Sequence, residues 1–415
     1  MVTDKSKKPE LRFKGFSDDW EQRKLGDIAD VTKLAGFEFT EHIVYSDEGS
    51  IIALRGLNVK DGQLVLDDVK YIDGSNFSKL GRSKLYENDV LFTYVGTVGE
   101  LAIVSENERF YLAPNVSRIR FQRGYDAQFM IQAMGSRTFY DNMIFPLIAT
   151  SSQPALSMEN IRKFIVSVPS DSAEQQEIGR YFLNLDNLIT LHQRKCENLK
   201  IIKKSMLDNL FPKNGEKIPR WRFKGFNDDW EQRKLSNVAE IVGGGTPSTL
   251  NPDYWDGDID WYAPAEIGKQ IFANGSIRKI TKDGLNHCSA KILPAYKTVL
   301  FTSRAGIGNM AILQRSAATN QGFQSLVCHD NIDPYFVFSM GDNIKIKAKH
   351  IAAGSTFAEI SGKKLGALEF MFPDADEQKA IGAYFMSLDK LITLHQSEVE
   401  RLKKVKQFFL DKMFI

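Results

Sequence analysis

With 415 residues, of which 43% are hydrophobic and 26% charged, the chain has the composition of a folded, water-soluble protein and the length for two cores. Its formal net charge is only +2, so the overall balance neither requires nor excludes a nucleic-acid partner, and any DNA-binding face must be local. Three cysteines cannot form a disulfide framework, no apolar run approaches a membrane span, and the first residues lack the apolar segment of a signal peptide. We therefore expect a cytoplasmic protein with no membrane contact.

A short segment near the start of the chain is repeated in its middle. RFKGFSDDWEQRKL, Arg12–Leu25, returns as RFKGFNDDWEQRKL, Arg222–Leu235, and only Ser17 and Asn227 differ. We call each copy the repeat box. The repeats divide the chain into six parts: an N-terminal box (1–25), a variable region (26–170), a long central helix (171–211), a linker with the second box (212–235), a second variable region (236–373) and a long C-terminal helix (374–415).

The two variable regions agree poorly in sequence but share a few marks. Both contain VLFT, at Val90–Thr93 and Val299–Thr302, followed by a glycine nine residues after each valine and by an Ala-Ile pair. Short β-branched or aromatic runs alternate with Gly, Asn and Asp turns and a few helical stretches. We therefore predict an α/β fold for each region.

The segments 174–212 and 377–415 align without gaps and agree at 21 of 39 positions. Apolar residues recur at alternating spacings of four and three, which is the heptad of a coiled coil. The pattern predicts two long α-helices that pair antiparallel within the chain as an intramolecular coiled coil, with a pseudo-two-fold internal repeat. We expect helix-pairing or partner contacts at Trp20, Trp230, Phe182, Leu185, Leu188, Ile189, Phe385, Leu388, Leu391 and Ile392.

Several details of the helices can be predicted. Ser172 with Gln175, and Asp374 with Glu377, have the spacing of a capping box, which marks a helix start. A glycine recurs near each start, at Gly179 and Gly382; because glycine weakens a helix, its recurrence suggests close packing against another element. His192 and His395 on the seam are interpreted as register-setting polar residues rather than metal ligands.

Four strings in the sequence are similar to catalytic or metal-binding motifs, and each lacks a feature that such a motif requires. NPDY (Asn251–Tyr254) is similar to an amino-methyltransferase motif, but no glycine motif for the methyl donor precedes it. IVGGGTPST lacks the Lys-Ser/Thr of a phosphate-binding loop and is interpreted as a flexible loop that exposes its backbone. PDADEQK (Pro373–Lys379) has nuclease letters at too short a spacing, and His287–Cys288 with Cys328–His329 lack zinc spacing. We predict no catalytic residue and no bound metal.

Binding is the alternative, since basic residues mixed with amide, hydroxyl and aromatic residues suit phosphate contact and base reading. The candidates for DNA contact are Lys33, Phe37, Phe39, Thr40, Arg55, Asn58, Arg118, Arg120, Thr246, Ser248, Thr249, Lys269, Gln270, Ser303, Arg304, Asn320 and Gln321. Surfaces that are identical in both halves can contact two copies of one partner. Surfaces that differ between the halves can read two different base sequences. On duplex DNA this arrangement predicts two unlike half-sites, with an unread spacer set by the helices.

The chain resembles the DNA-specificity subunit of Type I restriction–modification systems along essentially its whole length. The resemblance rests on the repeat boxes, AGFEFTE (Ala35–Glu41), GGGTPSTLNPDYWDGDIDW (Gly243–Trp261) and the twin EQ--IG-YF--LD-LITLHQ helices. Where the family usually has Thr or Ser and then Asp after that tryptophan, this chain has YAPAEI, and Glu266 takes the acidic position. The resemblance implies two α/β target-recognition domains, here 26–170 and 236–373, joined by two long antiparallel helices.

The resemblance also implies partners. They are double-stranded DNA, two methyltransferase subunits that bind S-adenosylmethionine and modify adenine, and two restriction subunits that are ATP-driven translocases and nucleases. The cofactors, S-adenosylmethionine, ATP and Mg, would then belong to the partners, with none held by this chain. Two other hypotheses remain: a stand-alone DNA adenine methyltransferase or nuclease, and a coiled-coil scaffold without a nucleic-acid role.

Overall fold

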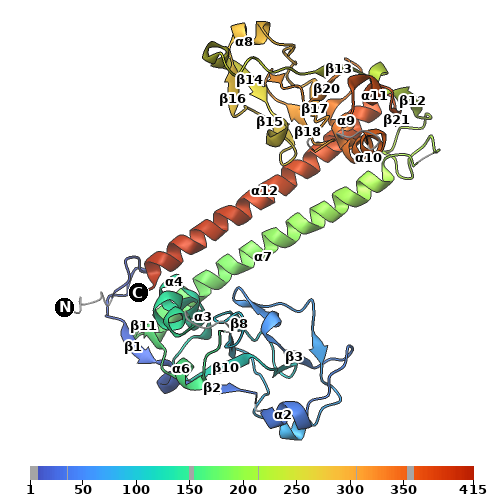
Figure 1. The fold of residues 1–415 in the computed structure, drawn as a ribbon. Helices are drawn as coiled ribbons and strands as arrows, with labels where there is room; N and C mark the ends of the chain where they lie inside the picture. The colour runs from blue at the N-terminus through green and yellow to red at the C-terminus, as the bar shows by residue number, and fades with distance from the viewer. Residues whose placement is uncertain (1–7, 35, 149–153, 214, 305, 353–358) are drawn as a thin grey trace. The chain divides into compact units, whose positions relative to one another are not determined.

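A computed structural model describes residues 8–34, 36–148, 154–213, 215–304, 306–352 and 359–415. The chain forms two compact units, Met1–Gln193 with Ser397–Ile415, and Arg194–Gln396. Both boundaries fall inside the long helices α7 (Ser172–Asn209) and α12 (Ala375–Met413), so each helix contributes to both units (Figure 1).

The first unit is built around two small sheets. The larger is antiparallel, in the order β2 (Ala29–Lys33), β10 (Val116–Phe121), β7 (Val90–Thr93), β8 (Leu101–Ile103). The smaller has the order β6 (Lys70–Tyr71), β3 (Ile52–Leu54), β9 (Phe110–Leu112), with β3 and β9 parallel. Two further pairs are β1 (Glu21–Lys24) with β11 (Ile165–Val168), and β4 (Val59–Lys60) with β5 (Gln63–Leu64). Its short helices are α1 (Leu25–Ile28), α2 (Gly36–Glu41), α3 (Ala127–Gly135), α4 (Arg137–Phe139), α5 (Phe145–Ile148) and α6 (Met158–Arg162).

The second unit repeats this plan. Its larger sheet has the order β13 (Ala239–Gly243), β20 (Gln324–Cys328), β17 (Thr298–Phe301), β18 (Met310–Leu313), β15 (Phe272–Ala273). Its smaller sheet has the order β16 (Arg278–Ile280), β14 (Trp255–Tyr262), β19 (Ala318–Thr319), with β14 and β19 parallel, and β12 (Glu231–Lys234) pairs with β21 (Glu369–Phe372). Its short helices are α8 (Lys282–Asn286), α9 (Pro334–Ser339), α10 (Gly341–Ala352) and α11 (Gly362–Gly366).

The sparse sequence matches between the variable regions fall on paired core strands. Val90 lies opposite Ile103 in the first unit, and Val299 lies opposite Ile312 in the second, at the same position of the same strand pair. All four strands in these pairs are largely buried. The core therefore keeps its topology and register while the surrounding residues differ, and the predicted α/β class is confirmed.

Each repeat box folds against the start of a long helix. In the first unit Arg12 donates two hydrogen bonds to the buried Glu174 carboxylate, at 2.6 and 2.7 Å; in the second, Arg222 binds Glu377 at 2.7 Å through both nitrogens. These hydrogen bonds raise the pKa of both guanidinium groups. Because a charge-assisted pair with two parallel bonds fixes orientation as well as position, the box is locked onto the helix. Trp230 adds an indole hydrogen bond to Glu377 at 3.1 Å.

The recurring glycines explain how the recognition region meets its helix. A Cβ atom on Gly179 would lie 2.5 Å from Asp126 Oδ1, and one on Gly382 would lie 2.2 Å from Asp333 Oδ1. Asp126 and Asp333 cap the equivalent helices α3 and α9. The predicted close packing of both glycines is confirmed, and any side chain there would push the capped helix away.

The long helices pair antiparallel within each unit. In the first unit Lys406 binds Asp186, and Tyr181 packs edge-on against Phe409 at 5.1 Å. In the second, Lys203 binds Asp389 at 2.6 Å. The heptad residues Phe182, Leu185, Ile189, Phe385, Leu388 and Ile392 are buried, as helix pairing requires. Trp20 and Trp230 are buried too, and a partner contact by any of these residues stays a prediction. Leu188 and Leu391 are exceptions to helix pairing, because each is 44% exposed.

The capping-box prediction is wrong in its details. Asp171, and not Ser172, caps α7, with its carboxylate accepting the Ala173 N–H at 2.8 Å. Asp374 does cap α12, but Glu377 is used by the repeat box instead of bonding back to the cap. The Gln175 side chain likewise bonds to other segments. Its amide N–H donates to the Pro169 carbonyl at 3.0 Å, and its amide oxygen accepts the Asp126 N–H at 3.1 Å. Glu377 and Gln175, which a capping box would use locally, instead make tertiary contacts.

Candidate nucleic-acid interface

One edge of the larger sheet gathers loops in each unit. The end of β2, the start of β10 and the end of β7 meet there, since Ser117 lies opposite Lys33 and Val116 opposite Thr93. In the second unit the end of β13, the start of β20 and the end of β17 meet in the same way, with Gly243 opposite Gln324. We call this edge the loop edge. Most candidate contact residues lie on its loops.

The loops after β7 and β17 share a hydrogen bond between a threonine hydroxyl and the loop backbone but carry different side chains. The Thr93 hydroxyl accepts the Glu100 N–H at 3.0 Å, and the Thr302 hydroxyl accepts the Asn309 N–H at 2.9 Å. Inside this shared frame, Tyr94 in the first unit takes the place of Ser303 in the second. The scaffold thus holds different side chains at the same point.

In the first unit, Lys33 is the clearest candidate. Its side chain is exposed, and its ammonium lies 5.3 Å from the centroid of the Tyr94 ring, a cation–π contact that prediction from the sequence missed. Phe39 and Thr40 are exposed on α2, where the Thr40 hydroxyl donates to the Gly36 carbonyl at 3.1 Å. The side chain of Phe37 lies outside the described part of the structure.

Three candidates are corrected by burial. Asn58 is fully buried and donates to the Val65 and Asp68 carbonyls at 2.8 Å, so it shapes its own loop. Arg118 is buried, pairs with Asp30 and donates to the Arg82 carbonyl at 3.2 Å. Ser303 is fully buried beneath the loop edge. In these positions none of the three reaches a base edge.

Arg55 and Arg120 are half-buried and already bind carboxylates. Arg55 donates to Asp68 at 2.8 Å, and Arg120 makes two bonds of 2.6 and 2.7 Å to the buried Asp89. The hydrogen bonds to Asp89 raise the pKa of Arg120. Because the carboxylate offsets the positive charge of a guanidinium paired in this way, both arginines stabilise the fold in the structure. A DNA contact by either arginine stays a prediction.

In the second unit the glycine-rich loop is closely packed against its neighbours, whereas the sequence analysis expects a flexible loop with an exposed backbone. A Cβ atom on Gly244 would lie 2.0 Å from the Asn320 carbonyl oxygen, and one on Gly245 would lie 2.6 Å from the Ala290 nitrogen. Glycines are needed because the backbone passes between two neighbouring segments. Beyond them, Thr246, Ser248 and Thr249 are exposed, and Thr246 hydrogen-bonds the exposed Gln321.

The remaining candidates of the second unit lie on neighbouring loops. Lys269 is exposed, while Gln270, Arg304 and Asn320 are half-buried. Gln270 donates to the Glu266 carbonyl, and Asn320 accepts the Gly322 N–H at 2.7 Å. Glu266 itself accepts the Ala263 and Ile277 N–H groups at 2.8 and 2.7 Å, so its carboxylate braces the loop. DNA contact by the exposed and half-buried candidates stays a prediction.

The strings with enzymatic appearance have structural roles. Asn251 caps the turn Pro252–Tyr254 by accepting the Asp253 N–H at 3.1 Å, and Tyr254 stacks on His287 with ring centroids 5.0 Å apart. Cys328 is buried, which raises the pKa of its thiol to about 12. Among the described residues no three His, Cys, Asp or Glu side chains lie close enough to hold a metal ion, and no helix is long and apolar enough to cross a membrane.

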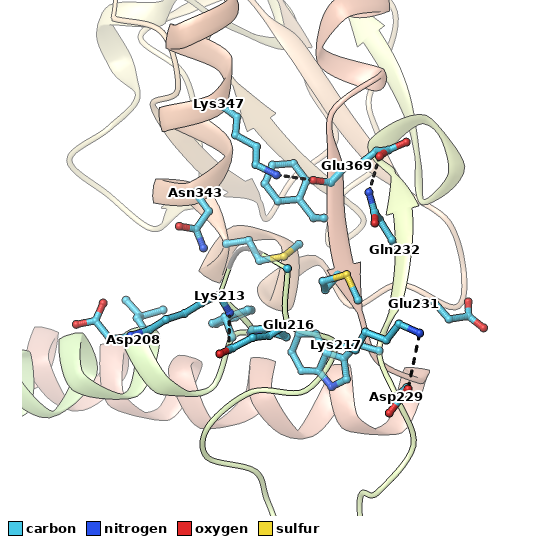
Figure 2. A pocket seen from close by; sticks show the side chains of 18 of the residues that line it. Asp208, Lys213, Glu216, Lys217, Asp229, Glu231, Gln232, Asn343, Lys347 and Glu369 are labelled. Atoms are coloured by element: carbon cyan, nitrogen blue, oxygen red, sulfur yellow. Dashed lines mark hydrogen bonds and ion pairs between the residues drawn. The ribbon is translucent and has the colours of Figure 1, made fainter.

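A cavity of about 1480 Å³ in the second unit lies between the repeat box, α10 and β21 (Figure 2). Several polar side chains of its lining are hydrogen-bonded or ion-paired. Lys347 donates to the Glu369 carbonyl at 2.7 Å, Gln232 donates to the Glu369 carboxylate at 2.5 Å, and Lys217 lies 4.0 Å from Asp229. The lining combines these polar groups with Trp230, Phe370 and Met371.

The long helices keep an exposed apolar face in each unit. The identical segments Leu188–Gln193 and Leu391–Gln396 present Leu188 and Leu191 in the first unit, and Leu391 and Leu394 in the second. Identical exposed residues in both halves are what two copies of one partner would require. The residues of the loop edge, in contrast, differ between the two units.

Comparison with known proteins decides the family. The chain matches the family described as Type I restriction modification DNA specificity domain twice, over residues 17–200 and 227–404. The chain belongs to this family. Each of the two matches covers one repeat box in part, one variable region and most of one long helix, so the DNA specificity domain occurs here as two copies.

Two relatives and one solved structure illustrate the likeness. The Type I restriction enzyme MjaIX specificity subunit of Methanocaldococcus jannaschii is 33% identical over 192 residues, which is 44% of this chain and 44% of that protein. The putative Type I restriction enzyme MjaX specificity subunit of the same organism is 22% identical over 95% of this chain and 92% of that protein. The S subunit of a Type-I restriction-modification system from M. genitalium has the same fold, with a TM-score of 0.69, 13% identity, and 98% and 99% of the chains covered.

Proposed function

We propose that the chain is the non-catalytic, sequence-specific DNA-recognition subunit of a Type I restriction–modification complex. In this role it reads a two-part, asymmetric target, with each specificity domain reading one half. One observation carries the proposal: both units keep the same order of four core strands (β2-β10-β7-β8 and β13-β20-β17-β18) and the same helix docking, while the loop edge differs in residue type. A common scaffold with unlike loops suits the reading of two unlike base sequences.

We further propose two kinds of protein partner. A methyltransferase subunit would bind each exposed apolar face, at Leu188 and Leu191 and at Leu391 and Leu394, which supports two copies in the complex. Two restriction subunits would join the assembly. S-adenosylmethionine, ATP and Mg would be bound by these partners. In support, the strings of this chain that are similar to methyltransferase and nuclease motifs, NPDY and PDADEQK, form a turn and a helix cap.

The test compares the purified chain with its complex. The chain together with the methyltransferase subunit of its own system should bind target DNA with a strong salt dependence and methylate adenine, since phosphate contacts release counterions. The chain alone should transfer no methyl group and cleave no DNA. Methyl transfer by the chain alone, abolished by Asn251→Ala, would contradict the non-catalytic role; a complex without DNA affinity would favour a scaffold.

A further inference from the structure

Leu250 is an apolar side chain displayed to solvent at the tip of the loop that follows β13. Its side chain is 93% exposed, the most among the large hydrophobic residues described. Exposed leucines are common on protein surfaces, so exposure alone assigns no role. The surroundings of Leu250 supply the argument.

The loop is held rigidly from beneath. The Trp255 indole donates to the Ser248 carbonyl at 3.1 Å, and the Trp261 indole donates to the Gly245 carbonyl at 2.9 Å. The two indoles pack edge to face at 5.2 Å, and the Arg278 guanidinium lies 3.5 Å from the Trp255 ring centroid. Because two tryptophan side chains hydrogen-bond to the loop backbone, the loop is anchored to the fold, and Leu250 at its tip is held toward solvent.

The residues beside Leu250 indicate what it meets. The same loop exposes the hydroxyl groups of Ser248, Thr249 and Thr246, and Thr246 hydrogen-bonds the exposed amide of Gln321. In the major groove an A·T pair shows a donor and an acceptor on adenine, which suit an amide, and the C5-methyl group of thymine, which suits an apolar side chain. A loop that carries one exposed apolar residue together with hydroxyl groups and a bound amide matches that edge.

The first unit supports this assignment. The segment after β2, which occupies the equivalent place, also exposes an apolar side chain, Phe39. The two positions are chemically similar but carry different residues, whereas the face that we assign to a duplicated protein partner is identical in both halves. We propose that Leu250 contacts the C5-methyl group of a thymine in the half-site read by the second unit. This inference rests on the proposed function.

The experiment uses the full chain in complex with the methyltransferase subunit of its system. Binding to a target duplex is measured by fluorescence anisotropy for wild type and Leu250→Ala, while each thymine of the second half-site is replaced singly by deoxyuridine. One replacement should weaken wild-type binding about fourfold, the effect of removing one buried methyl group. The same replacement should leave Leu250→Ala unchanged, because that variant has already lost the contact.

Tyr296→Asn is the matched control. Tyr296 is 70% exposed in the same unit, at the opposite end of β17, and its φ of 58° is one that asparagine tolerates. Its binding should equal that of wild type. Leu250→Ala with wild-type affinity, or equal uracil effects in wild type and Leu250→Ala, would overturn the inference. Failure of the wild-type complex to prefer its target over other DNA would instead overturn the proposed function.

Discussion

Gly382→Ala sets two effects of opposite sign against each other. Alanine in place of glycine inside a helix ordinarily stabilises it by about 1 kcal/mol. Here the new Cβ atom would lie 2.2 Å from Asp333 Oδ1, 3.0 Å from its Cγ and 3.2 Å from the Phe336 nitrogen. Asp333 caps α9 by accepting the Phe336 N–H at 2.7 Å, so the clash falls on a working helix cap.

The clash should win. Forcing an extra methyl group into a packed contact costs about 1 to 3 kcal/mol, and losing a helix cap costs about 1 kcal/mol. After the gain in helix propensity, we expect a net loss of about 1 to 3 kcal/mol for Gly382→Ala. Urea unfolding of the full chain, followed by circular dichroism, measures the change.

The neighbouring aspartate offers a decisive control. Asp333→Ala removes both clashing side-chain atoms, so Gly382→Ala introduced into that variant should be neutral or stabilising. In the first unit the Cβ atom on Gly179 would also lie 2.8 Å from the Phe129 backbone nitrogen, which no side-chain change can remove. Gly179→Ala should therefore stay destabilising in an Asp126→Ala variant. Stabilisation by Gly382→Ala in the wild-type chain, or the same effect with and without Asp333, would refute this reasoning.

Two further predictions concern partners and modularity. Leu188→Asp with Leu391→Asp should change the free energy of unfolding by less than about 0.5 kcal/mol, since both residues are exposed, yet reduce methyltransferase assembly as measured by native mass spectrometry; undiminished assembly would place the partner face elsewhere. Exchange of residues 26–170 for another domain of the family should alter one half-site in a methylation map, whereas a change in both halves would contradict separate reading.

The long helices were predictable because their signal is periodic and local. The alternation of four and three identified the buried seam without any knowledge of tertiary structure, and two half-buried lysines, Lys203 and Lys406, fall in the same alternation. Their partners, Asp389 and Asp186, could not be found in this way, because the antiparallel register between two segments about 200 residues apart decides them. A repeated sequence therefore predicts the elements better than it predicts their contacts.

The candidate contact residues were less predictable. Asn58, Arg118 and Ser303 have the chemistry of DNA readers, but their burial depends on strands distant in sequence. A pattern of polar and basic residues does not predict Leu250, although its place beside a glycine-rich loop is a usable signal. Residue type indicates what a side chain could do, and only the fold determines what it faces.

The central claim is that one chain directs modification to two unlike half-sites. Single-molecule sequencing of methylated adenine, in DNA from cells with and without the chain, tests it most directly. The account predicts that the chain's presence adds one methylated motif made of two different half-sites separated by a fixed gap. Methylation that is unchanged by loss of the chain, or a motif that is continuous or symmetric, would contradict it.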